Sequence, residues 1–287
     1  MALPARTLPA EPAHSGMSTE TFKQLRDLIY EHTGILFADN KKYLLESRLQ
    51  PRLAACQCRS YDDYYRFLKA DAYRDREFTT LYAAVTTNET FFYRDEAQLE
   101  TFTKLIVPAL IERNKDKRSI RVWSAACSTG DEPYTLAMML ASHPPLANWT
   151  IDILATDISE VALDQARKGV YDAHALRKAP AHIVQRYFTG GPDRYVVAAP
   201  IMKLVRFMNI NLYDRARLKL VRGIDVIFCR NCLIYFDAKA RQQIVSDLTD
   251  ALVPQGYLVI GFSESLRDMT ARLKSTHLGR SVVYQRQ

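Results

Sequence analysis

Several features are absent from this chain of 287 residues, and each absence argues against a class of protein. No apolar run approaches the roughly 20 residues that a membrane-spanning helix requires, so we expect no membrane insertion. The opening stretch, MALPARTLPAEPAHSG, has no apolar segment of the kind found in a secretory signal. The chain also lacks the G-x-x-x-x-G-K-[ST] pattern of a phosphate-binding loop. An integral membrane protein, a secreted precursor and a P-loop protein are therefore poor fits.

Cysteine and histidine are few and show no regular spacing. The five cysteines, an odd number, favour a reducing cytoplasm over a disulfide framework. Cys229 and Cys232, taken together with Cys56 and Cys58, have the residue types of a zinc site. One of these pairs lies at a predicted strand end, however, and the six histidines show no ligand spacing. We therefore expect a cytoplasmic protein without a bound metal.

Positive charge is modest overall, at +7, but it is concentrated in residues 41–76, which hold nine Lys and Arg against five acids. Leucines at helical spacing predict a helix here, which should begin after a cap at Asp39 or Asn40. Pro51 should kink or end that helix. The cations on its polar side are Lys41, Lys42, Arg48 and Arg52. Such a face fits an acidic partner surface, and it also fits an ordinary solvated helix.

The pattern of residues 17–85 predicts a small helical domain without strands. Its first helix has apolar residues at helical spacing over 21–33 and stops at Gly34. Residues 1–16, rich in proline and alanine, are expected to form a disordered tail, with Met17 as an alternative start.

The chain is organised around residues 121–137, RVWSAACSTGDEPYTLA. A short β-type run breaks into small residues, among them Gly130, which permits a tight turn and close backbone approach to a ligand. A helix then starts at Asp131 and Glu132, where acids are favoured. Acids at this turn favour a positively charged ligand such as S-adenosylmethionine over a phosphate. A well-capped helix after any parallel strand is the alternative.

Alternating strand and helix patterns in residues 96–287 predict an α/β fold with a doubly wound, mostly parallel sheet. Strands are expected at 120–123, 149–155, 223–229 and 257–260, and helices at 96–113, 131–137, 159–167 and 238–252. Residues 281–284 should form a final edge strand. The interval of about 171–210 interrupts the alternation, and we expect an inserted subdomain with a small antiparallel sheet, including strands at 195–198 and 203–207.

Candidate ligand-binding residues follow the predicted strand ends, where ligands lie in sheets of this type. Asp157 ends the second strand at about the distance from Gly130 expected of an acid that binds ribose hydroxyls. It would serve equally as a cap of the next helix. Residues 211–212 and 230–236 follow later strands and should border the same crevice. The linker, residues 86–95, fits either a loop that folds over the ligand or a domain junction plugged by aromatic side chains.

Five segments closely resemble motifs of the chemotaxis receptor glutamate methyltransferase (CheR) family, in the order the family has them. They are TTNETFFYR (86–94), VWSAACSTGDEPYT (122–135), ATDIS (155–159), NINL (209–212) and FCRNCLIYF (228–236). The resemblance implies a helical domain joined to an S-adenosylmethionine-dependent methyltransferase fold, with S-adenosylhomocysteine as product. It also implies methylation of glutamate side chains on the cytoplasmic helices of chemoreceptors, giving methyl esters.

The resemblance further implies roles for individual residues. Cofactor contacts are implied for Asn88, Thr90, Arg94, Glu132, Asp157, Ile158, Asn211, Leu212, Arg230 and Asn231. Within this set, Glu132 is expected near the methionine ammonium and Asp157 at the ribose. Arg94 and Tyr235 are the implied catalytic residues, which would orient the substrate glutamate. The basic helix face defined above is expected to face the receptor, and we expect a monomer.

The chemistry agrees with this assignment. A carboxylate is already ionised at neutral pH, so its methylation requires positioning rather than a strong general base. Two rival functions stay open: a nucleic-acid methyltransferase that grips with the basic helical domain, and a non-catalytic module that senses the cofactor. Tyr61 and Tyr64 recur at helical spacing among basic residues, which predicts core packing more than nucleic-acid contact. We therefore expect no nucleic-acid partner.

Overall fold

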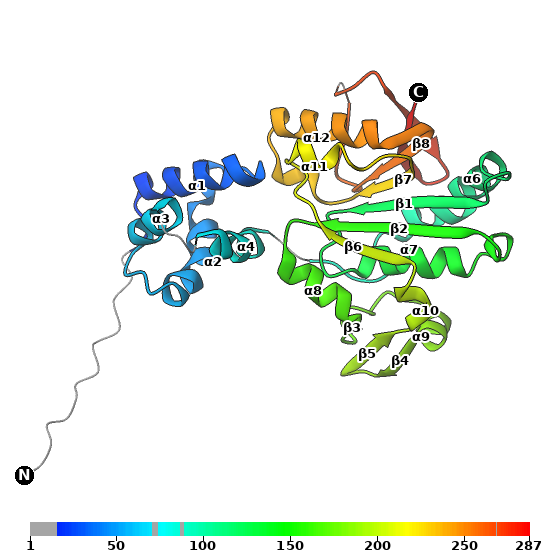
Figure 1. Cartoon of the computed structure of the whole chain (residues 1–287), viewed down its shortest axis with the longest axis horizontal. Helices are drawn as coiled ribbons and strands as arrows, with labels where there is room; N and C mark the ends of the chain where they lie inside the picture. The colour runs from blue at the N-terminus through cyan, green and yellow to red at the C-terminus, as the bar shows by residue number, and fades with distance from the viewer. Residues whose placement is uncertain (1–15, 71–73, 87–88, 268) are drawn as a thin grey trace, which may run out of the picture.

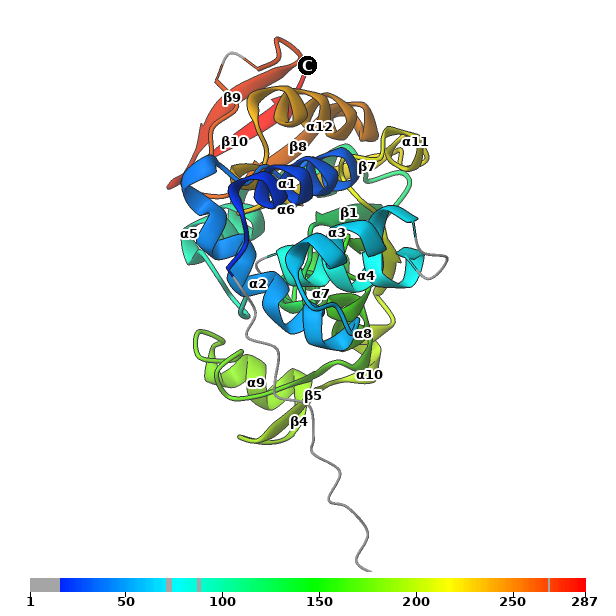
Figure 2. The same ribbon diagram turned by 90° about the vertical axis from the view of Figure 1, so that its left-hand side faces the viewer.

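The computed structural model describes residues 16–70, 74–86, 89–267 and 269–287. A group of N-terminal helices lies beside a larger α/β unit (Figure 1). In the view of Figure 2, the N-terminal helices lie in front of the large sheet. Within the described ranges, no helix is both long enough and apolar enough to cross a membrane.

The N-terminal part consists of helices, as predicted. They are α1 (Thr19–Thr33), α2 (Lys42–Ala55), α3 (Tyr61–Ala70) and α4 (Arg74–Val85), with the 3-10 turn η1 (Asp39–Lys41) before α2. The Ser18 hydroxyl caps α1 by accepting from the Thr21 N–H at 3.0 Å, and Gly34 ends it in the left-handed conformation. Tyr61 and Tyr64 are buried in the core, which confirms the packing role predicted for them.

Helix α2 differs from its prediction at its cap, and of the two effects expected of Pro51, a kink or an end, it does not show the end. Neither Asp39 nor Asn40 caps it, because Asp39 lies in η1 and pairs with Arg26 at 2.6 Å. Pro51 does not end the helix, which continues to Ala55. Proline has no N–H, so the carbonyl of Ser47, one turn earlier, lacks its usual donor. Ser47 and Pro51 are both exposed, so water can satisfy that carbonyl.

The large sheet has the order β6-β2-β1-β7-β8-β10-β9. Its strands are β1 (Ser119–Ala125), β2 (Thr150–Asp157), β6 (Val205–Asn209), β7 (Ile224–Cys229), β8 (Leu252–Ile260), β9 (Leu273–Leu278) and β10 (Ser281–Arg286). The first five strands of that order run parallel, and β10 runs antiparallel to both of its neighbours. This arrangement confirms the doubly wound, mostly parallel sheet. All six residues of β7 are buried, as expected of a central parallel strand.

Helices cover both faces of the sheet, with α11 and α12 on one face and α7 and α8 on the other (Figure 1). These and the preceding helices are α5 (Glu96–Thr101), α6 (Val107–Arg113), α7 (Asp131–Ala141), α8 (Glu160–Lys168), α11 (Arg215–Leu218) and α12 (Ala238–Ala251), with the short turns η3 (Pro144–Leu146) and η4 (Leu233–Tyr235). The helix predicted over 96–113 contains one π-helical turn, η2 (Phe102–Ile106). One continuous core joins α1–α4 to the α12 face of the sheet.

Two strand assignments need correction. Residues 281–284 do form a strand, but β10 lies inside the sheet and β9 is the edge. The sequence of β9, LKSTHL, is mostly polar, which suits a strand with only Leu273 buried, so it gives little strand signal. The strand expected at 203–207 is β6, and it belongs to the large sheet, where it runs parallel to β2.

A separate three-stranded antiparallel sheet lies between α8 and β6, as expected for the inserted segment. Its elements are β3 (Val170–Tyr171), β4 (Phe188–Gly191), β5 (Arg194–Val197), α9 (Ala181–Tyr187) and α10 (Ala199–Met202). Since β6 pairs in the large sheet, the small sheet consists of β3, β5 and β4 alone.

Candidate functional site

A cavity of about 310 Å³ lies where the carboxyl ends of the parallel strands meet the N-terminal helices. The sheet register explains why separate motifs converge here. Asp157, the last residue of β2, pairs with Asn209, the last residue of β6. Ten residues singled out from the sequence line the cavity: Thr90, Arg94, Glu132, Asp157, Ile158, Asn211, Leu212, Arg230, Asn231 and Tyr235. Asn88 lies outside the described residues.

Asp157 is buried and is held by main-chain amides on both carboxylate oxygens. The Ser128 N–H donates to Oδ2 and the Ser159 N–H to Oδ1, each at 2.8 Å. Ser159 itself caps α8 with its hydroxyl, so Asp157 is not the capping residue of that helix. Burial raises the pKa of Asp157, and the backbone amides oppose that rise. Its remaining lone pairs are available to hydroxyl groups of a ligand.

The turn between β1 and α7 is tight, with φ of 63° at Ala126, 49° at Ser128 and 93° at Gly130. The Ser128 hydroxyl is buried and has no hydrogen-bond partner in the described part of the chain, although the residue lines the cavity. Such a hydroxyl suits a polar ligand atom. Gly130 does not line the cavity. A Cβ at Gly130 would lie 2.8 Å from the Cβ of Ala166 and 2.9 Å from the Tyr171 hydroxyl, so this glycine allows α7 to pack against α8 rather than a ligand to approach.

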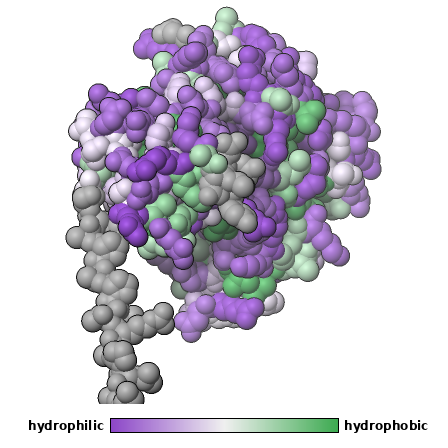
Figure 3. Space-filling view, turned by 60° about the vertical axis from the view of Figure 1, so that its left-hand side comes forward, coloured by the Kyte–Doolittle hydropathy of each residue, from purple (hydrophilic) through white to green (hydrophobic). Residues whose placement is uncertain are grey.

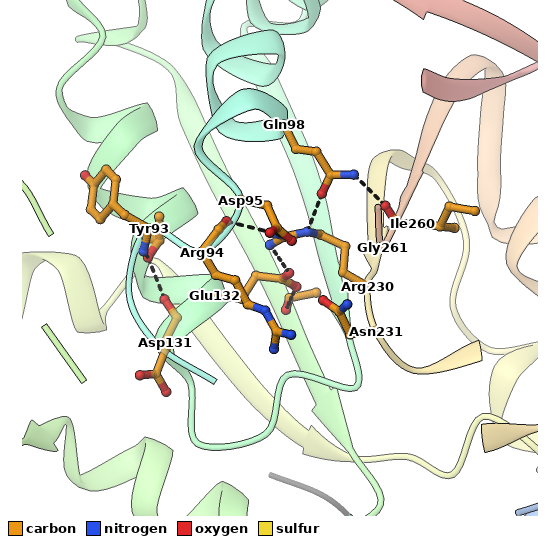
Figure 4. Close-up of polar contacts among 12 residues, drawn as sticks. Tyr93, Arg94, Asp95, Gln98, Asp131, Glu132, Arg230, Asn231, Ile260 and Gly261 are labelled. Carbon is orange, nitrogen blue, oxygen red and sulfur yellow. Dashed lines mark hydrogen bonds and ion pairs between the residues drawn. The ribbon is translucent and has the colours of Figure 1, made fainter. Parts of the chain in front are cut away.

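Arg230 is the centre of a buried hydrogen-bond network and has a side chain only 4% exposed (Figure 4). Its Nη2 donates to the Asp95 carboxylate at 2.6 Å and to the Arg94 carbonyl at 2.8 Å. Its Nη1 donates to Glu132 at 2.9 Å, and its Nε donates to the Gln98 side-chain oxygen at 2.7 Å. The guanidinium is thus engaged by four protein groups, and Arg230 shapes the cavity largely through them.

Glu132 lies between this network and the first turn. Its Oε2 accepts from Arg230, and its Oε1 accepts from the Ser124 hydroxyl at 2.6 Å. The carboxylate is therefore fixed at the start of α7, where the helix N-terminus also favours negative charge. It lines the cavity together with Glu89 and Asp157, so three acids stand against two arginines, Arg94 and Arg230, and the excess of acid favours a cationic ligand.

The linker contains an aromatic plug, and part of it lines the cavity. Phe92 is fully buried, and its N–H donates to the Ala175 carbonyl of the inserted segment at 2.9 Å, which makes it the aromatic plug. Phe91 and Arg94 line the cavity. The Arg94 guanidinium lies 5.7 Å from the centre of the Phe91 ring, and the guanidinium of Arg177 stacks on the same ring at 3.8 Å.

The N-terminal helices also contribute to the cavity, which the sequence did not predict. The backbone N–H of Leu36 donates to the Tyr235 carbonyl at 3.0 Å, and the Asn211 amide donates to the His32 carbonyl at 2.7 Å. These bonds attach the end of α1 to two loops of the α/β unit. The cavity-lining residues from the helical part are Thr33, Ile35 and Val85.

The basic face expected on α2 is only partly available to a partner. The Arg52 guanidinium forms a two-bond salt bridge with Glu77, at 2.9 and 2.7 Å, so it belongs to the interior of the helical part. Arg48 is half-buried and donates to the main-chain carbonyl that ends α4. Burial lowers the pKa of Arg48. Lys41 is exposed and Lys42 half-exposed, so fewer cations of this face are available to a partner than predicted.

Two further findings bear on the sequence predictions. The five cysteines are free thiols, with Cys229 buried and Cys232 lining the cavity. In the described ranges, no group of three or more His, Cys, Asp or Glu residues is arranged to hold a metal ion.

The strand order, with an acid ending β2 beside a cavity lined by carboxylates, defines the class as an α/β fold of the S-adenosylmethionine-dependent methyltransferase type. The chain belongs to the CheR methyltransferase family. The family's SAM-binding domain matches residues 88–282, and its all-alpha domain matches residues 20–86.

Named relatives agree with this membership. Chemotaxis protein methyltransferase 2 of Vibrio cholerae is 35% identical over 85% of this chain and 85% of its own length. The chemotaxis protein methyltransferase of Borreliella burgdorferi is 33% identical over 88% of this chain and 90% of its own length. Chemotaxis protein methyltransferase Cher2 of Pseudomonas putida is 33% identical over 92% of this chain and 97% of its own length. The protein is thus an S-adenosylmethionine-dependent methyltransferase.

Proposed function

We propose that this enzyme transfers methyl groups from S-adenosylmethionine to glutamate side chains on the cytoplasmic helices of a chemoreceptor, giving methyl esters and S-adenosylhomocysteine. The observation that carries the proposal is that Arg94 and Tyr235, two groups able to hold a carboxylate, share one cavity with the acids suited to the cofactor. Relatives named chemotaxis protein methyltransferases support the chemotaxis setting.

The cavity has the groups that such a cofactor needs. When bound, S-adenosylmethionine supplies a methyl group on a positively charged sulfonium. Asp157 would hold the ribose hydroxyls, Glu132 would lie toward the methionine ammonium, and the partnerless Ser128 hydroxyl would gain a polar contact. Ile158 and Leu212 would pack against the adenine. The remaining proposed contacts are Asn88, Thr90, Arg94, Asn211, Arg230 and Asn231, with Arg230 acting through Glu132.

The proposed substrate requires orientation rather than deprotonation. Arg94 donates from Nη1 to the Glu89 carbonyl at 2.7 Å, which fixes the guanidinium and leaves its other N–H groups for a carboxylate. The Tyr235 hydroxyl would hold the same substrate oxygen, leaving the second oxygen free to attack. Arg94 and Tyr235 are therefore the proposed catalytic residues, and most of the rate enhancement would come from positioning.

The surface near Tyr235 suits a protein substrate. Leu36 is 46% exposed and Ile234 is 51% exposed, and both lie next to the Tyr235 backbone, the first by hydrogen bond and the second by sequence. Hydrophilic side chains dominate the face that bears the N-terminal helices, with smaller hydrophobic patches between them (Figure 3). We propose that Lys41 and Lys42 attract the acidic receptor helices, in a monomeric cytoplasmic enzyme without a nucleic-acid partner.

The domain division stays part of this proposal: a tail at 1–16, a helical domain at 17–85, a linker at 86–95 and a methyltransferase domain at 96–287 with its insertion at about 171–210. The two family matches adjoin at residues 86–88, which supports a junction in the linker.

A labelled-methyl assay tests the function. Receptor cytoplasmic fragments and total RNA are offered side by side with labelled S-adenosylmethionine, and incorporated label is then treated with mild base. We expect incorporation into the receptor fragment that is released by base, as carboxyl esters are. Base-stable label, or label in RNA alone, would contradict the proposal.

A further inference from the structure

The segment Arg230–Phe236 connects β7 to α12 and supplies six residues of the cavity lining, all but Leu233. Its only regular structure is the short turn η4. A segment with so few internal hydrogen bonds needs partners elsewhere for its backbone amides. Those partners decide where Tyr235 lies.

Glu264, in the loop after β8, supplies them. Its Oε2 accepts from the Asn231 N–H at 3.0 Å and from the Gly261 N–H at 2.6 Å. Its Oε1 accepts from the Ile234 N–H at 3.2 Å. One carboxylate thus joins three backbone amides. One of them, Asn231, lies just before the turn that carries Tyr235, and another, Ile234, lies within it. Bonds to a charged acceptor are the stronger kind of hydrogen bond.

The two loops fit closely at this point. A Cβ added to Gly261 would lie 2.8 Å from the Asn231 backbone nitrogen and 2.8 Å from the Glu264 carboxylate. Asn231 itself has φ of 56°, a left-handed conformation that the surroundings must hold in place. The glycine and the carboxylate therefore act together on the backbone of Asn231.

The opposite side of the same segment is held by the helical part. The Leu36 N–H donates to the Tyr235 carbonyl at 3.0 Å, and Ile35 forms an isolated antiparallel bridge with Phe236. The Tyr235 peptide is thus fixed between a carboxylate of the α/β unit and the end of the α1 segment. Glu264 does not line the cavity, so its influence on a substrate passes through the backbone.

We propose that Glu264 is a positioning residue that sets the place of the Tyr235 side chain in the cavity. The inference rests on the proposed function, in which Tyr235 orients the substrate carboxylate. Removal of the Glu264 carboxylate frees the Asn231 and Ile234 amides, so Tyr235 samples unproductive positions. Of the proposed cofactor contacts only Asn231 bonds directly to Glu264, and those at the ends of β1 and β2 stay in place, so cofactor affinity should change much less than the rate.

The experiment uses the full-length enzyme and compares Glu264→Ala with Ser265→Ala. The control removes a hydroxyl of the same loop that, among the described residues, accepts a hydrogen bond only from the Arg267 amide. We expect Glu264→Ala to lower kcat for receptor methylation at least tenfold, with S-adenosylhomocysteine affinity changed less than threefold. Ser265→Ala should match the wild type. Glu264→Gln keeps one oxygen that accepts from the amides, so its kcat should lie between those of the wild type and the alanine variant.

A double-mutant cycle separates positioning from general loss of structure. If Glu264 acts through Tyr235, Glu264→Ala should cost less than threefold in a Tyr235→Phe background. A full tenfold loss in that background, or a cofactor affinity that falls as much as the rate, would overturn the proposal.

Amide hydrogen exchange provides a test that does not depend on the substrate. Exchange at Asn231 and Ile234 should be at least tenfold faster in Glu264→Ala than in Ser265→Ala. Unchanged exchange at both amides would overturn the role of Glu264. A wild-type enzyme that fails to methylate the receptor would instead contradict the proposed function, and the exchange result would still decide the role of Glu264.

Discussion

Replacing Arg230 with methionine should lower the free energy of unfolding by more than the loss of a surface ion pair would. Methionine replaces the alkyl part of the arginine but has no N–H groups. The variant therefore loses the four hydrogen bonds to Asp95, the Arg94 carbonyl, Glu132 and Gln98. Breaking a buried ion pair from one side costs about 3–5 kcal/mol. The figure applies here mainly to Glu132, whose side chain is 13% exposed and is left without its cation, whereas Asp95 is 33% exposed and regains water. In a protein of this size such a cost corresponds to a fall in Tm of about 10 °C.

The same substitution should weaken cofactor binding. Tyr93 and Asp95 both have φ of 60°, so the backbone on either side of Arg94 is strained and depends on its bonds to Arg230. Without these bonds, Arg94 and Glu132 lose their fixed positions at the cavity. We expect S-adenosylhomocysteine affinity to fall at least tenfold, as measured by titration calorimetry below the Tm of the variant.

Arg167→Met is the matched control. Arg167 is an arginine of α8 that also pairs with two acids, Glu160 and Asp164, but on the exposed surface. Its loss should cost less than about 1 kcal/mol. Unfolding in urea measures both variants under the same conditions. If Arg230→Met and Arg167→Met lose the same free energy of unfolding, the argument from the buried network is wrong.

Four further outcomes follow from the site. Asp157→Ala should weaken S-adenosylmethionine and S-adenosylhomocysteine binding alike, by about 2–3 kcal/mol, and unchanged affinity of a folded variant in calorimetry would remove Asp157 from the site. Tyr235→Phe should lower kcat more than cofactor affinity, and equal losses of both would assign Tyr235 to binding instead. Burial raises the pKa of Asp131 to about 6, so the folded protein keeps a proton that the unfolded chain has lost between about pH 4 and 6, and stability falls as pH rises through that window. Asp131→Asn should therefore gain about 3 kcal/mol relative to the wild type between pH 4 and pH 7 in urea unfolding, and a pH-independent difference would contradict the burial argument. Lys41→Glu combined with Lys42→Glu should slow receptor methylation at low salt while cofactor affinity stays intact, and a wild-type rate in that assay would place receptor docking elsewhere.

Much of the fold could be predicted because its signals are local. The apolar run of β7 predicts a buried strand whatever surrounds it, and Gly34 ends α1 because its own backbone adopts the left-handed conformation. Alternation of such elements restricts the topology to a doubly wound sheet, which places Asp157 and the 230–236 segment at one edge. For this reason Asp157 and the segments at 211–212 and 230–236 could be gathered from the pattern alone, while the other candidates and the individual roles came from the family resemblance.

Which charged groups form salt bridges, and which strands pair, was decided only by the tertiary structure. Asp39 could equally cap a helix or pair with a cation, and the position of Arg26 decided the matter. The strand β9 has no apolar alternation of its own and forms because β10 offers it hydrogen bonds. Arg52 looks like a surface charge in its helical pattern, yet Glu77, 25 residues away, takes it into the interior.

The same distinction holds at the site. The sequence identifies Arg230 and Tyr235 as polar residues after a strand, because that depends only on local pattern. It does not show that the first is engaged by four protein groups, or that the backbone of the second lies between Leu36 and the loop of Glu264. These contacts join residues that are between 30 and 136 positions apart or that belong to separate domains, and no local propensity encodes them. They exist because the sheet edge brings the chain segments together, so they are properties of the packed molecule alone.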